Sequence, residues 1–133
     1  MDAPRLPDSA LADLALLSRV VLLVFQPTVK DVRFVRAAIS FLADVGVPQR
    51  RIVPVANRVK KRGPLVRMED SKKVVGLDSF ACIRSDWCKA MRSVNLAQPL
   101  AQAAKRSSLR KDFQKLAAKI HSNGTNGKNT ERG

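Results

Sequence analysis

Three short polar segments follow apolar runs of the chain, and they hold residue types that could bind a nucleotide base. They are Gln26-Pro27-Thr28, Asn57-Arg58 and Arg84-Ser85-Asp86. An amide such as that of Asn57 offers a donor and an acceptor together, and a carboxylate such as Asp86 accepts from an exocyclic amine. These are the groups that an adenine or guanine edge requires. Asn and Asp are also ordinary turn and cap residues, so the alternative is that both only shape turns.

Asp2, in the segment Asp2-Ala3-Pro4, is the candidate metal-binding residue. A carboxylate that follows a strand can hold the magnesium of a nucleotide through water. The alternative is a frayed N-terminus, because the chain begins one residue before Asp2. Zinc needs about four protein ligands, so Cys82, Cys88 and the single His121 do not predict a zinc site. A single histidine near the C-terminal end of the chain also excludes a Ser-His-Asp or Cys-His arrangement.

The phosphate-binding sequence of P-loop enzymes, G-x-x-x-x-G-K-[ST], is absent from this chain. Residues 124–130 contain a Gly-Lys pair, but the spacing is wrong and the segment follows no predicted strand. Nothing in the sequence therefore aligns or neutralises the β- and γ-phosphates of a nucleotide. We expect negligible ATP hydrolysis by this chain alone.

The chain has 25 Lys and Arg against 11 Asp and Glu, which gives a formal net charge of +14 in 133 residues. This excess attracts polyanions: nucleic acid, nucleotides or an anionic membrane surface. Stacking platforms for bases are scarce, since there is one Trp and no Tyr. The alternative is that the charges form solvated faces of a basic protein. The candidate nucleic-acid-binding residues, besides the basic face of the last predicted helix, are Arg50, Arg51, Lys60, Lys61 and Arg62.

Apolar runs predict three strands, at 20–25, 52–56 and 79–83. The first run, VVLLVF, has no alternation, which is typical of a strand buried on both faces in a parallel sheet. Pro54 removes a backbone donor from the second strand and indicates a local irregularity there.

Helical periodicity separates these strands. Thr28 is expected to cap a helix whose apolar stripe recurs at Val32, Val35, Ile39 and Leu42 and which ends at Gly46. Ser9, Ser85 and Ser108 are the expected caps of further helices. The helix after Ser85 is expected to face inward with Trp87, Ala90, Met91 and Val94. Further helices are expected at 9–17 and 68–75, with a short piece after Pro99 and an amphipathic helix to residue 120. That last helix either lies on a membrane surface or packs its apolar stripe on the sheet.

Strands that alternate with helices predict the α/β class: a parallel sheet of about three strands flanked by helices in three α/β/α layers. Residues 1–120 are expected to form the domain, and residues 121–133, which have no apolar side chain, a disordered tail. We expect a cytoplasmic protein. No secretory signal is recognisable, no apolar run approaches the ~20 residues of a membrane span, and two cysteines do not form a disulfide framework.

In the order and spacing of these segments, the chain resembles the C-terminal half of a ParA/MinD-type ATPase. This is the deviant Walker group of P-loop NTPases, and within it the similarity is greatest to CpaE-like proteins of pilus assembly. The stretches that resemble the family are Asp2-Ala3-Pro4, VVLLVFQPTVKDVRFVRAAISFL, RIVPVANR, IRSDW and LAQPLAQAAKRSSLRKDFQKLAAKI. The chain departs from the pattern at Arg84, where the family has Pro, and at Asn95, where it has Gly. The N-terminal half of the family, with its Walker A loop, has no counterpart here.

The resemblance implies a partial P-loop NTPase fold that binds ATP and magnesium. The implied nucleotide-binding residues are Asn57, Arg58, Asp86 and Pro27, with Asn57 facing the adenine edge. Asp2 would lie near the magnesium. These roles follow from the resemblance and not from the composition or periodicity of the chain.

In the family, the strand at 20–25 lies beside the Walker A strand, so its edge is expected to be bare here. A bare apolar edge presents unpaired N–H and C=O groups. We therefore expect a homo-oligomer, or a partner protein that covers 20–25. Two functions remain open: a nucleotide-binding or positioning module related to pilus assembly or partition ATPases, and a basic, non-enzymatic module that binds nucleic acid such as DNA non-specifically.

Overall fold

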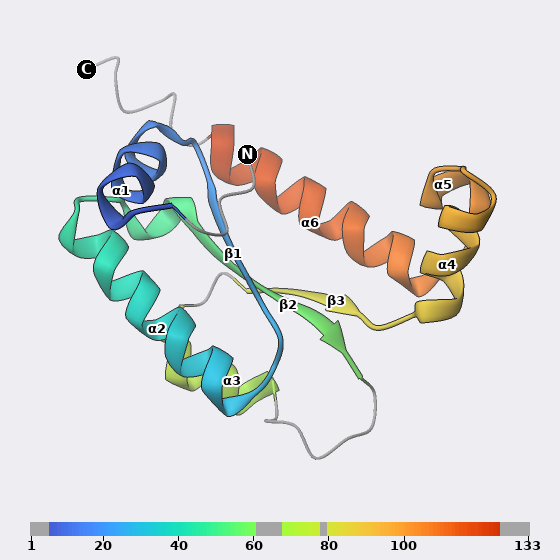
Figure 1. Cartoon of the computed structure of the whole chain (residues 1–133), viewed down its shortest axis with the longest axis horizontal. Helices are drawn as coiled ribbons and strands as arrows, with labels where there is room; N and C mark the ends of the chain where they lie inside the picture. Colours follow the sequence, from blue (N-terminus) through green and yellow to red (C-terminus); the bar gives the residue numbers. More distant parts are fainter. Residues whose placement is uncertain (1–5, 61–67, 78–79, 126–133) are drawn as a thin grey trace.

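The computed structural model describes residues 6–60, 68–77 and 80–125. Helices and strands alternate along the chain (Figure 1). The elements in chain order are α1 (Asp8–Leu17), β1 (Val21–Phe25), α2 (Val29–Asp44), the 3-10 turn η1 (Gln49–Arg51), β2 (Ile52–Val59), α3 (Met68–Val75), β3 (Ala81–Arg84), α4 (Trp87–Asn95), α5 (Leu100–Ala103) and α6 (Ser108–Thr125).

The three strands form one parallel sheet in the order β1-β2-β3. β1 and β2 pair in continuous register from Val21 opposite Ile52 to Phe25 opposite Ala56. Each connection between neighbouring strands contains a helix, the usual form of the long crossover that parallel pairing requires. The predicted α/β class with a three-stranded parallel sheet is confirmed.

Pro54 lies inside the paired part of β2, opposite Leu23, so the irregularity expected at this residue is not in the ladder with β1. A proline has no N–H, so Val53 and Val55 on either side of it must make the bonds to β1. The nitrogen of Pro54 therefore faces β3, whose pairing with β2 begins only at Val55. The register shift lies further on, between Ala56 and Val59.

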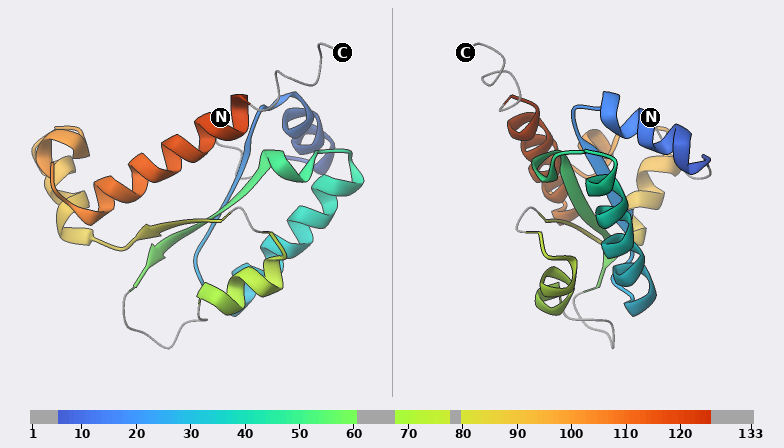
Figure 2. Two further views of the ribbon diagram at one scale, coloured as in Figure 1. Left: turned by 180° about the vertical axis from the view of Figure 1, so that it is seen from behind. Right: turned by 90° about the vertical axis from the view of Figure 1, so that its left-hand side faces the viewer.

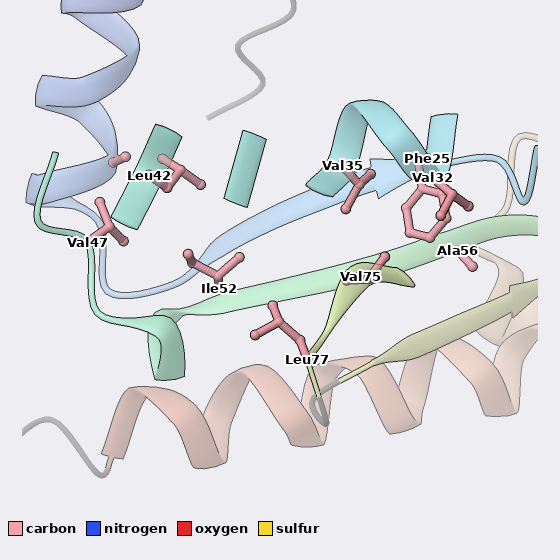
Figure 3. Packing of buried hydrophobic residues seen from close by; sticks show 10 residues of the cluster. Phe25, Val32, Val35, Leu42, Val47, Ile52, Ala56, Val75 and Leu77 are labelled. Carbon is pink, nitrogen blue, oxygen red and sulfur yellow. The ribbon is translucent and has the colours of Figure 1, made fainter. Parts of the chain in front are cut away.

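Alternate residues of β2 enter two separate hydrophobic cores. Ile52 and Ala56 pack against α2 and α3, while Val53 and Val55 pack against α6. Figures 1 and 2 show α2 and α3 on one side of the sheet and α6 on the other, which gives the three expected layers. Figure 3 shows the first core, whose labelled members are Phe25, Val32, Val35, Leu42, Val47, Ile52, Ala56, Val75 and Leu77.

The sequence of α2 determines both of its ends, as predicted. The hydroxyl of Thr28 accepts a hydrogen bond from the N–H of Asp31 at 3.1 Å, which caps the helix. Gly46 has φ 93°, a conformation that residues with a Cβ rarely adopt, and it ends the helix. Between these ends, Val32, Val35 and Leu42 are buried on the core side.

Three helices begin at other residues than the serines that we expected. α1 follows Pro7, Asp86 caps α4 by accepting from the N–H of Lys89 at 3.1 Å, and Ser107 caps α6 by accepting from the N–H of Arg110 at 3.1 Å. The side chain at an N-cap accepts from a backbone N–H two or three residues further along the helix. In α4 and α6 the residue that does so is the neighbour in sequence of the serine that we predicted.

The prediction that Trp87 and Val94 face the core is wrong, since each is 70% exposed. α4 lies beyond the carboxyl end of β3 and packs against α5 (Figure 1), so most of its apolar side has no sheet to cover. Only Ala90 reaches the core between the sheet and α6.

α6 packs on the sheet through Leu109, which is buried, and Leu116, which is half-buried. Of the two alternatives for the last helix, binding a membrane surface or packing on the sheet, the structure agrees with packing on the sheet. No helix within the described residues is long and apolar enough to span a membrane. α6 continues past His121, where we expected a tail to begin, as far as Thr125, and the rest of the expected tail lies outside the described residues.

Candidate functional site

The carboxyl ends of β1 and β2 form a surface pocket of about 450 Å³. Open α/β sheets bind ligands at this edge, because the strands end there and loops and helix N-termini surround the space. The pocket is lined by Val24, Phe25, Gln26, Asp31, Phe34, Asn57 and Arg58. Two of the four predicted nucleotide-binding residues, Asn57 and Arg58, are therefore side by side in one pocket.

Asn57 and Arg58 lie within β2 and do not follow it, because β2 continues to pair with β3 as far as Val59. Arg58 has φ 57°, in the left-handed region, and it lies in the segment where the β2–β3 register shifts. The Oδ1 atom of Asn57 accepts a hydrogen bond from the N–H of Arg58 at 2.9 Å. This bond fixes the amide and leaves its NH₂ group as the donor for a ligand.

Asp31 and Phe34 complete the pocket from the first turns of α2 and were not predicted as site residues. Asp31 accepts from the N–H of Gln26 at 3.3 Å through one carboxylate oxygen. Phe34 is 73% exposed, because it lies off the buried stripe of α2. That position outside the apolar stripe is the sequence signal that could have identified Phe34.

The structure does not bring the other predicted site residues into this pocket. Pro27 is buried beside it and is not part of its lining. Asp86 lies at the same carboxyl edge but follows β3, and its carboxylate caps α4. Asp86 therefore acts as a helix cap, which was the alternative to base binding for this residue. Asp2 lies outside the described residues, and the described part of the chain has no group of three or more His, Cys, Asp or Glu that could hold a metal ion.

The basic residues between 50 and 62 do not form one surface. Arg50 and Arg51 lie in η1 before β2, whereas Lys60 follows β2. The eight residues of β2, at a rise of about 3.3 Å each, separate the two groups by about 26 Å. Arg50 lies beside the end of α6, where its carbonyl oxygen accepts from Nδ2 of Asn123 at 3.3 Å. Lys61 and Arg62 lie outside the described residues.

An ion pair that the sequence did not predict joins β3 to α6. Arg84 contacts Asp112 through Nη2 at 2.8 Å and Nε at 2.9 Å, and the N–H of Arg84 donates to the same carboxylate at 3.0 Å. The Asp112 side chain is 6% exposed. The hydrogen bonds from Arg84 lower the pKa of Asp112 below its ordinary value. The two residues are 28 positions apart, so no local pattern connects them.

A second pocket of about 530 Å³ lies beside this ion pair, between β3 and α6. Its lining includes Arg84, Asp112, Lys115 and Lys119, and Nζ of Lys119 donates to the carbonyl oxygen of Phe80 at 3.1 Å. Cys82 also lines it, and burial raises the pKa of that thiol, which opposes formation of a reactive thiolate. The carboxylate of Asp112 is already paired with Arg84, and Lys119 already donates to a backbone carbonyl, so these two groups are less open to a ligand than those of the pocket at Asn57.

No protein-family model, no curated protein and no solved structure matches the chain. What the two pockets can bind therefore follows from their own residues.

Proposed function

We propose that this chain is a nucleotide-binding or positioning module of the ParA/MinD type, similar to CpaE-like pilus assembly ATPases. In this proposal it holds a purine nucleotide at the carboxyl edge of its sheet. One observation carries it: Asn57, Arg58 and Asp31 line a single pocket at the ends of two parallel strands. The ends of parallel strands are the usual ligand site of open α/β sheets.

The pocket has a group for each part of a purine. The NH₂ of Asn57 can donate to a ring nitrogen, since the oxygen of that amide already accepts from Arg58. Asp31 keeps one carboxylate oxygen for an exocyclic amine, because only Oδ2 accepts from Gln26. The exposed ring of Phe34 offers a face on which a base can stack. Arg58 is exposed and supplies a positive charge for phosphate.

Binding in this proposal is not followed by hydrolysis. The chain has no G-x-x-x-x-G-K-[ST] segment that would align the phosphates. Magnesium would enter only through Asp2, which lies outside the described residues, so no step is derived from the metal.

The first prediction is that the chain binds a fluorescent ATP analogue and that Asn57→Ala weakens binding about tenfold. Removing one hydrogen-bond donor to a base costs about 1.4 kcal/mol, which corresponds to that factor. Phe34→Ala should weaken binding to a similar extent by removing a stacking face. Fluorescence anisotropy measures both effects, and phosphate release from ATP should stay at the level of buffer.

The matched control is Asn95→Ala, the same change at an exposed asparagine at the end of α4, away from the pocket. This variant should bind as the wild type does. Equal binding by Asn57→Ala and Asn95→Ala would reject the pocket as the base site. No binding by the wild type at millimolar nucleotide would reject the proposal itself.

A second candidate function, non-specific binding of nucleic acid, is favoured by the charge of α6. The sequence of α6 contains one acidic residue, Asp112, and that residue is buried and paired with Arg84. The exposed side of the helix thus carries Lys111 and Lys115 with no carboxylate among them. These two lysines are four residues apart, on one side of the helix. Arg50 lies beside the C-terminal end of the same helix.

The second prediction is a steep salt dependence of DNA binding that α6 controls. In a filter-binding titration, replacing Lys111 and Lys115 together by Ala should reduce the slope of log affinity against log salt by about 2, one for each phosphate contact. The control is Lys30→Ala with Arg36→Ala, which removes the same charge from exposed positions on α2 across the sheet. Equal slopes for both double variants would contradict a binding face on α6.

A further inference from the structure

β1 is an edge strand with no partner on its outer side within the described residues. The sheet order is β1-β2-β3, so β1 pairs with β2 alone. α2 covers one face of β1, but the side chains on its other face are open: Leu22 is 38% exposed and Val24 61%. α6, which covers that face of the sheet, lies against β3.

Pro54 determines which backbone groups of β1 are free. Since Pro54 has no N–H, the residues of β2 that bond to β1 are Val53 and Val55. Their partner on β1 is Leu23, which lies opposite Pro54. Backbone groups of successive residues in a strand point to opposite sides. The N–H and C=O groups of Leu22 and Val24 therefore point outward, and the described part of the chain supplies no hydrogen-bond partner for them.

The run of unpaired backbone groups on β1 ends at Val24. The next residue whose backbone groups point outward is Gln26, and both of these groups are hydrogen-bonded within the following turn. The N–H of Gln26 donates to Asp31 at 3.3 Å, and its carbonyl oxygen accepts from the N–H of Thr28 at 2.7 Å. β1 has none of the features that block edge pairing: it contains no charged residue, no proline and no bulge. A short, uncharged and apolar segment is left open on a chain of net charge +14.

We infer that β1 pairs with β1 of a second copy of this chain, antiparallel, about a two-fold axis at Leu23. In this register Leu22 of each copy lies opposite Val24 of the other, and the two residues exchange both of their backbone hydrogen bonds. The same operation places the exposed side chains of Leu22 and Val24 beside those of the partner. The two three-stranded sheets then become one continuous sheet.

A second copy fits this edge better than a charged partner does. The basic charge of the chain would attract an acidic partner, yet no charged side chain stands in β1 to select one. The segment is self-complementary, because a two-fold axis at Leu23 satisfies every outward group of Leu22 and Val24 at once. Isologous pairing of this kind closes as a dimer and leaves no further β1 edge open.

The third prediction is a dimer in sedimentation equilibrium, with a mass twice that of the chain, whose population rises with salt. Salt screens the repulsion between two copies of net charge +14. Association bridged by nucleic acid would instead weaken as salt rises. Val24→Pro removes an outward N–H without removing a bond to β2 and should be monomeric. Val24→Thr keeps that N–H and should remain dimeric. A wild type that is monomeric at millimolar concentration, or a Val24→Pro variant as dimeric as the wild type, would overturn the inference.

Cross-linking tests the register and does not depend on the folding of the proline variant. In a background with Cys82→Ser and Cys88→Ser, a mixture of Leu22→Cys and Val24→Cys proteins should form a disulfide-linked heterodimer under mild oxidation. Neither protein alone should cross-link, because residue 22 faces residue 24 and not its own copy. Cross-linking of either protein by itself, or none in the mixture, would overturn the proposed register.

Hydrogen exchange supplies an independent readout on the unmodified chain. The amides of Leu23 and Phe25 bond to β2 and should exchange slowly at every concentration. The amides of Leu22 and Val24 should be protected only where the dimer forms. Fast exchange at Leu22 and Val24 in a sample of dimeric mass would place the contact elsewhere and contradict the inference.

Discussion

Ile52→Ala should reduce the free energy of unfolding by about 3 to 4 kcal/mol, which is the usual cost of truncating a fully buried isoleucine and leaving a cavity in the core. Ile52 is 0% exposed and lies at the start of the central strand, where it belongs to the core between the sheet, α2 and α3 (Figure 3). A domain of this size has about 5 to 15 kcal/mol in total. This one substitution should therefore remove a large part of the stability, as measured by urea denaturation followed by circular dichroism.

The control for Ile52→Ala is Val94→Ala, which also truncates an aliphatic side chain but on α4, where Val94 is 70% exposed. That change should alter stability by less than about 0.5 kcal/mol. A loss below about 1 kcal/mol in Ile52→Ala would mean that α2 and the sheet are not packed tightly at this point.

Asp112→Asn should reduce stability by about 2 kcal/mol and should also change how stability depends on pH. The carboxylate accepts from the guanidinium and from the N–H of Arg84, and an amide can accept with only one oxygen while its NH₂ opposes the guanidinium. Arg84 is partly exposed and can turn towards water, so the loss stays below that of a fully buried ion pair.

The pH effect follows from the lowered pKa of Asp112. The folded protein holds this carboxylate ionised at pH values where the unfolded chain has begun to bind a proton. The stabilisation is therefore complete above about pH 4, the ordinary range of Asp, and disappears as the pH falls through the folded pKa. The difference in stability between wild type and Asp112→Asn should shrink correspondingly below pH 4.

Asp13→Asn, at an exposed position on α1, is the matched control for the charge change. It should leave the stability close to that of the wild type across this pH range. If Asp112→Asn showed the same acid dependence as the wild type, the ion pair with Arg84 would not be the source of the effect.

Local patterns in the sequence were sufficient for the elements of the sheet and for the face of α2. The run VVLLVF correctly placed a parallel strand, but the prediction that this strand is buried on both faces is wrong, because Leu22 is 38% and Val24 61% exposed on the face away from α2. Thr28 and Gly46 delimit α2 because capping and left-handed turns involve neighbouring residues only. The parallel order of the strands followed from the helices between them.

The errors fall where a residue's environment is made by distant segments. Trp87 and Val94 have helical spacing for a buried face, but α4 lies beyond the sheet, so nothing there covers them. Asp112 of α6 is buried because it meets Arg84 of β3, a residue 28 positions away that no local pattern connects to it.

What the sequence alone determined is the alternation of helices and strands, the parallel sheet and the excess of positive charge, because these depend on local periodicity and composition. Only the tertiary structure decided that Asn57 shares a pocket with Asp31 and Phe34, and that Asp86 serves α4 instead. Likewise, only the register of Pro54 against β1 revealed which backbone groups of Leu22 and Val24 are free. Which side chains from separate elements meet depends on the order of the strands in the sheet and on how each helix is rotated about its axis. Neither of these is determined by one local stretch of sequence.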